Sequence, residues 1–199
     1  MLKAAKQCHS MALILAIFVI FIFINKPITA QPVDKMPESA KVELMGANGK
    51  MPTAIFFPDG DGEKPLMLVV HTSGGLYQSE IDYAIRLQKA GFIAVVPDFY
   101  TAYNITPRTK RLTWSKYQEA IHEDFVKIID QVKKMSKVPS NKVFAVGFSN
   151  GGYWAAFLAA NGDVDAGISY YGAYSEGGLC RGRNGLDNCS IGSVLSDES

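Results

Sequence analysis

The strongest chemical signal in the sequence is a serine between glycines. Residues 143–152 read VFAVGFSNGG, so Ser149 is the centre of the pattern G-x-S-x-G from Gly147 to Gly151. On a tight turn from a strand into a helix, such a serine projects its hydroxyl away from the sheet. The helix N-terminus adds free N–H groups that can stabilise an oxyanion. The pattern predicts a serine nucleophile; the alternative is a glycine-rich turn that only packs tightly.

A second segment has the composition of an oxyanion loop. The sequence HTSGG, from His71 to Gly75, follows the apolar run LMLVV. A backbone N–H of Thr72 or Ser73 can pair with the N–H of Asn150 to bind the oxyanion of a tetrahedral intermediate. We expect His71 to hold this loop by hydrogen bonding rather than to act as a catalytic base.

The sequence offers no obvious base for the serine. A triad of this elbow type has its acid and then its histidine after the nucleophile. The three histidines are His9, His71 and His122, and all of them precede Ser149. His122 occurs among acidic residues of an amphipathic segment, so we expect a solvated surface side chain.

The candidates for the acid are equally few. Glu176 follows the last predicted buried strand, which is a position that can hold a triad acid. Asp98 follows an apolar strand and is better explained as a structural hydrogen-bond acceptor. Asp187 and Asp197 lie in the C-terminal tail with nothing that favours a catalytic role.

The elements that would position these residues alternate between strands and helices. Strands that are apolar throughout indicate a parallel sheet covered on both faces, here with an antiparallel hairpin before it. Residues from Thr101 to Thr109 are expected to form a loop. The predicted strands are 41–45, 53–57, 66–70, 92–96, 143–146 and 166–171, and the predicted helices are a segment around 81–88, 114–135 and 153–160.

Several of these segments together resemble one family. HTSGG after a buried strand, GFIAVVPDFY, VFAVGFSNGG and ISYYG, in this order and spacing, look like the dienelactone hydrolase family of α/β-hydrolases. The resemblance covers residues 51–178 and implies the α/β-hydrolase fold. Many members carry a cysteine nucleophile, so Ser149 is a departure toward the general esterase pattern.

The resemblance also implies an activity. Members of the family hydrolyse small carboxylic esters or lactones without a cofactor, and no residue cluster suggests a metal. The alternative is a catalytically inactive α/β-hydrolase fragment without the triad acid and histidine. The formal net charge of +1 gives a nucleic-acid role no electrostatic support.

The N-terminus reads as a secretory signal. Lys3 and Lys6 precede an apolar stretch from Met11 to Ile24, and a small residue, Ala30, ends the segment. We expect residues 1–30 to be a signal peptide of a secreted or periplasmic protein; an uncleaved membrane anchor is the alternative. Residues 31–50 are then a leader and the first strand.

The C-terminal residues do not continue the pattern. Residues 179–199 are polar and aperiodic, and we expect an irregular tail outside the family domain. Cys180 and Cys189 lie in it and could form a disulfide in an oxidising compartment. Because at least two further βα units would be needed for the acid and the base, a C-terminally truncated hydrolase is expected.

Overall fold

The structure, a computed structural model, describes residues 37, 40–135, 142–172 and 194–197. The predicted signal segment, Glu176, both tail cysteines and most of the tail lie outside these residues. Within the described ranges, no helix is long and apolar enough to span a membrane.

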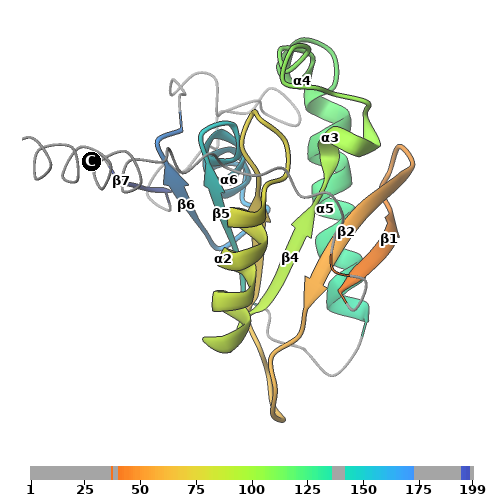
Figure 1. Ribbon diagram of the computed structural model, residues 1–199. Coiled ribbons are helices and arrows are strands. Elements are labelled where there is room, and N and C mark those ends of the chain that lie inside the picture. Colours follow the sequence, from red (N-terminus) through yellow and green to blue (C-terminus); the bar gives the residue numbers. More distant parts are fainter. Residues whose placement is uncertain (1–36, 38–39, 136–141, 173–193, 198–199) are drawn as a thin grey trace, which may run out of the picture. The chain divides into compact units, whose positions relative to one another are not determined.

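A seven-stranded mixed sheet forms the centre of the domain (Figure 1). Its order is β1-β2-β4-β3-β5-β6-β7, with β1, β2 and β4 paired antiparallel and the remaining pairs parallel. This confirms the predicted mostly parallel sheet with an antiparallel lead-in. The strands are β1 (Lys41–Met45), β2 (Lys50–Phe56), β3 (Leu66–Val70), β4 (Ile93–Pro97), β5 (Val143–Phe148), β6 (Ala166–Tyr170) and β7 (Val194–Asp197).

Helices cover both faces of the sheet, which explains why its central strands are apolar at every position. In Figure 1, α2 lies in front of the sheet, and α5 and α6 lie behind it. Residues of β3 alternate between two cores: Val69 packs on the α2 side, and Leu68 and Val70 pack with α5 and α6. The helices are α2 (Gln78–Lys89), α3 (Phe99–Ala102), α4 (Leu112–Ser115), α5 (Gln118–Lys134) and α6 (Asn150–Ala160).

The long helix predicted over residues 114–135 is in fact two helices. Lys116 has φ −129°, outside the helical region, and separates α4 from α5. The break allows both Thr113 and Gln118 to be buried, which the apolar periodicity alone did not reveal. The predicted loop also begins later than expected, because α3 occupies Phe99–Ala102.

Asp98 holds the start of α3. Its Oδ1 accepts the N–H of Thr101 (3.0 Å) and its Oδ2 accepts the Thr101 hydroxyl (2.6 Å). The expected structural role of Asp98 as a hydrogen-bond acceptor at the strand end is therefore confirmed.

The tail contains one element that the sequence did not predict. β7 pairs in parallel with β6, with Gly167 opposite Val194 and Tyr170 opposite Asp197. The expectation of an irregular tail is thus wrong for residues 194–197. The sequence there, VLSD, is too short to show a period that would predict a strand; the edge of β6 supplies its hydrogen-bond partners.

Candidate active site

Ser149 occupies a strained turn between β5 and α6. Its φ of 53° and ψ of −112° lie outside the regions that non-glycine residues ordinarily adopt. The Ser149 N–H donates to the carbonyl oxygen of Tyr170 (2.9 Å), which ties the turn to β6, and the Ser149 carbonyl accepts the N–H of Tyr153 (3.2 Å). Such strain persists only where the surroundings enforce it, and it is typical of functional turns.

The glycines around Ser149 are required by close backbone contacts. A Cβ atom on Gly147 would lie 1.9 Å from the carbonyl oxygen of Gly151. A Cβ atom on Gly151 would lie 2.0 Å from the carbonyl oxygen of Val70. The G-x-S-x-G spacing therefore lets α6 begin directly against β3 and β5. The helix starts at Asn150, three residues earlier than predicted, because the turn itself supplies its first residues.

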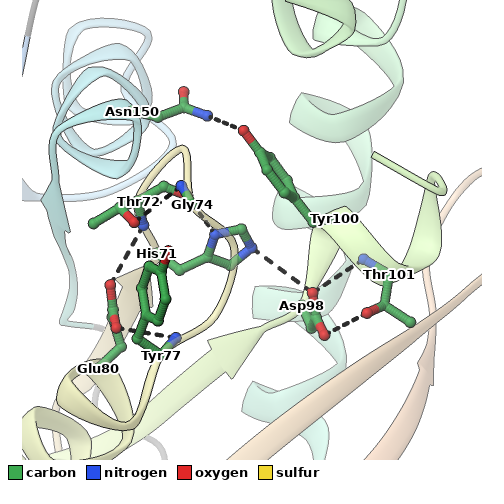
Figure 2. Close-up of polar contacts among 9 residues, drawn as sticks. All are labelled: His71, Thr72, Gly74, Tyr77, Glu80, Asp98, Tyr100, Thr101 and Asn150. Carbon is green, nitrogen blue, oxygen red and sulfur yellow. Dashed lines mark hydrogen bonds and ion pairs between the residues drawn. The ribbon is translucent and has the colours of Figure 1, made fainter. Parts of the chain in front are cut away.

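Asn150 lies at the first position of α6 and is buried. Its backbone N–H has no acceptor within the helix, as for every first-turn N–H. Its side-chain Nδ2 donates to the hydroxyl of Tyr100 (3.3 Å), so the start of α6 is joined to α3 (Figure 2). Tyr100 was not recognised as a site residue from the sequence; its place in the PDFY segment was the available signal.

The loop after β3 has its own fixed geometry. The Thr72 carbonyl accepts the N–H of Gly75 (3.2 Å), and the Thr72 hydroxyl accepts the N–H of Gly74 (3.2 Å). The Thr72 N–H donates to Oε1 of Glu80 (3.4 Å) (Figure 2). Because its N–H already has a carboxylate acceptor, Thr72 is the less suitable of the two candidate oxyanion donors, and Ser73 remains.

Glu80 is a buried carboxylate that the sequence analysis did not single out. It is 1% exposed and accepts the N–H of Tyr77 (3.2 Å) and the hydroxyl of Ser79 (2.8 Å) as well as the Thr72 N–H. Its position in the first turn of α2 is typical of a capping glutamate. Tyr77 at the N-cap is an unusual capping residue, which is why the pattern was not recognised.

His71 is completely buried in the core. Its ring is stacked on Phe99 (centroids 4.1 Å apart) and its Nδ1–H donates to the Thr72 carbonyl (2.9 Å). Its Nε2 lies 3.9 Å from Oδ1 of Asp98 (Figure 2). The expected structural role of His71 in the loop fits this geometry.

Burial keeps His71 neutral. Burial lowers its pKa from 6.5 to about 4, and the hydrogen bond to Thr72 and the charge of Asp98 offset only part of the effect. In the unfolded chain the imidazole binds a proton below pH 6.5, whereas in the fold it does so only near pH 4. The free energy of unfolding is therefore expected to fall as the pH drops through this window.

We expect His71 to account for a loss of about 3 kcal/mol between pH 7 and pH 4. Urea unfolding across this range measures it. His71→Phe retains a ring against Phe99 but cannot be protonated, so its stability should depend less on pH in the same window. An unchanged pH dependence in this variant would contradict the assignment.

His122 is not the solvated side chain that the sequence predicted. Its Nε2 lies 2.6 Å from Oδ2 of Asp163, and its ring packs edge-on against Phe157. Asp163 is distant in sequence, so the acidic neighbours of His122 on α5 gave no hint of this pair. Phe157 lies eight residues after Ser149, about 12 Å along α6 at 1.5 Å per residue. His122 is therefore not placed to accept the Ser149 proton.

No group of three or more His, Cys, Asp or Glu side chains that could hold a metal ion occurs in the described part of the chain. The remaining sequence-predicted acid, Glu176, lies outside the described residues.

The fold and the elbow together define an α/β-hydrolase. The dienelactone hydrolase family model matches residues 51–184, which is close to the range expected from the sequence, and the chain belongs to that family. A search of curated proteins found no match.

Solved structures share the fold. A putative dienelactone hydrolase from Klebsiella pneumoniae is 19% identical, with a TM-score of 0.56 over 78% of this chain and 70% of its own. A structure titled m3DLH is 20% identical, with a TM-score of 0.56 over 68% of this chain and 60% of its own. Est1E from Butyrivibrio proteoclasticus is 18% identical, with a TM-score of 0.51 over 67% of this chain and 51% of its own.

Proposed function

We propose that the protein hydrolyses small carboxylic esters or lactones, with Ser149 as the nucleophile. The observation that carries the proposal is the strained backbone of Ser149, at φ 53°, between the end of β5 and the start of α6. A backbone conformation of this kind is costly for a serine and is typical of a nucleophile elbow. Family membership supports hydrolase chemistry at the turn.

In the proposed reaction, Oγ of Ser149 attacks the carbonyl carbon of the substrate. The carbonyl oxygen gains the negative charge, and the N–H groups of Asn150 and Ser73 stabilise it. The proton lost by the Ser149 hydroxyl passes through water to the departing alkoxide, so the tetrahedral intermediate collapses to an alcohol and an acyl group on Oγ of Ser149. Water then adds to this ester, which releases the carboxylic acid and restores the hydroxyl. Glu80 supports the reaction by holding the loop through the Thr72 N–H.

A second candidate function follows from the histidines. His71 is stacked on Phe99 and His122 is paired with Asp163, so neither is seen bonded to Ser149, and a serine without a base is a weak nucleophile. A protein with this elbow and no base would bind small carbonyl compounds without turnover.

Labelling with a serine-directed fluorophosphonate tests the nucleophile. We expect one adduct, on the peptide that contains Ser149, because an activated hydroxyl reacts far faster than an ordinary one. Ser149→Ala should abolish the label. Ser73→Ala is the matched control and should keep it, since only its backbone N–H is used. Absence of any adduct in the unmodified protein would favour the second candidate.

A further inference from the structure

A positively charged surface surrounds an exposed tryptophan on α4 and the turn before it. It consists of Arg108, Lys110, Arg111, Trp114 and Lys116, all of them exposed; we call it the Trp114 surface. Trp114 is 37% exposed, whereas the other tryptophan, Trp154, is completely buried. A single exposed apolar side chain is common on protein surfaces; what distinguishes Trp114 from the other exposed apolar side chains is the cluster of four cations around it.

The cations of this surface have no acidic partners among the described residues. No Asp or Glu occurs between Asp98 and Glu119 in the sequence. Among the described residues, none of the four cations forms an ion pair with a carboxylate. Lys116 instead lies over the ring of Tyr117, 4.7 Å from its centroid. The positive charge is therefore available to an external anion.

The Trp114 surface rests on an ordered support. The Thr109 N–H donates to the carbonyl of Thr106 (3.0 Å), and the Leu112 N–H donates to the carbonyl of Thr109 (2.9 Å). Ile105 and Thr113 are buried on either side of this turn. The backbone that carries the cations is thus held in place before any partner binds.

The surface lies beside the elbow. The ring of Trp114 packs edge-on against that of Tyr153, with centroids 6.2 Å apart. Tyr153 in turn donates its N–H to the carbonyl of Ser149 (3.2 Å). In Figure 1, α3 and α4 lie beyond the carboxyl end of β4, and Tyr153, one helical turn after Ser149, lies between the elbow and Trp114.

We propose that the Trp114 surface binds bilayers that contain anionic phospholipids. Lys and Arg side chains are attracted to anionic headgroups, and an indole is favoured at the boundary between headgroups and acyl chains. A single partly exposed indole among cations suits a bilayer surface better than a strand of nucleic acid, which requires a groove with several stacking rings. Bilayer binding would bring Ser149 to esters dissolved in the lipid.

Co-sedimentation of the full chain with vesicles tests this. We expect tighter binding to vesicles of equal parts phosphatidylcholine and phosphatidylglycerol than to phosphatidylcholine alone. Each cation contributes about fivefold in affinity at such a surface, so the double variant Arg108→Gln and Arg111→Gln should bind about 25-fold more weakly. The N-terminal apolar stretch is common to all variants and cancels in this comparison.

A matched control variant loses the same two positive charges at a site outside the Trp114 surface. Lys133→Gln with Lys134→Gln, at the exposed end of α5, should bind anionic vesicles as the unmodified protein does. In addition, binding should shift the emission of the exposed Trp114 to shorter wavelength, and Trp114→Phe should remove that shift.

Equal affinity of the Arg108 and Arg111 variant and the unmodified protein, or an equal loss in the lysine control, would overturn the proposal. So would binding to a single-stranded oligonucleotide in preference to anionic vesicles. Hydrolysis of a soluble ester does not depend on the Trp114 surface, so failure of lipid binding is distinguishable from failure of the proposed activity.

Discussion

Replacing Ser149 by alanine is expected to reduce the hydrolysis of p-nitrophenyl acetate by about 100-fold or more. The acyl group is transferred to Oγ of Ser149 in the proposed reaction, and alanine offers no atom to receive it. The change removes one oxygen at a half-buried position, so the fold should remain. Initial rates of nitrophenolate release, measured at equal concentrations of the two proteins, give the ratio.

Ser73→Ala provides the reference for the kinetic experiment. Its backbone N–H, the group assigned to the oxyanion, is unchanged, so we expect kcat/KM close to that of the unmodified protein. If Ser149→Ala and the unmodified protein release nitrophenolate at the same rate, Ser149 is not a working nucleophile. The protein is then the inactive elbow described as the second candidate.

Gly151→Ala is expected to destabilise the fold by about 4 kcal/mol, an unusually large effect for one methyl group. The new Cβ would lie 2.0 Å from the carbonyl oxygen of Val70 and 2.8 Å from that of His71. Both contacts are with backbone atoms at the end of β3, in the core of the sheet. Neither can move without separating α6 from β3. The midpoint and slope of urea unfolding give the change in stability.

Gly162→Ala is the matched control for this prediction. Gly162 has φ +73° and nothing within 4 Å of an added Cβ, so alanine meets only backbone strain there. We expect a loss of about 1 kcal/mol. If the two variants lose equal stability, the close approach of α6 to β3 is not what requires glycine at position 151.

Much of the site could be predicted because its signals are local. The pattern around Ser149 contains the two glycines whose missing side chains allow the turn, and the apolar run VFAV before it predicts a strand. In the same way, HTSGG after LMLVV locates the loop that faces the elbow. The conformation of a short turn depends mainly on its own residues, so the sequence is sufficient there.

The partners of the titratable groups could not be predicted. His122 faces Asp163 rather than the carboxylates near it on α5, and the Thr72 N–H donates to Glu80 rather than remaining free. These contacts depend on how separate elements pack, and no local pattern specifies them. The short helix α4, which carries Trp114, was also not predicted as a separate helix, because the helical spacing of apolar residues continues from α4 into α5.

The sequence by itself determined the α/β class, the family and the position of the serine, since hydrophobic periodicity and turn chemistry are properties of short segments. Only the tertiary structure decided that His71 is stacked on Phe99, that His122 pairs with Asp163, and that the Thr72 N–H donates to Glu80. It also revealed four cations around the exposed Trp114, none of them ion-paired with a described carboxylate. Burial and charge pairing arise between segments that are far apart in the chain, and they exist only once the sheet and its helices have assembled.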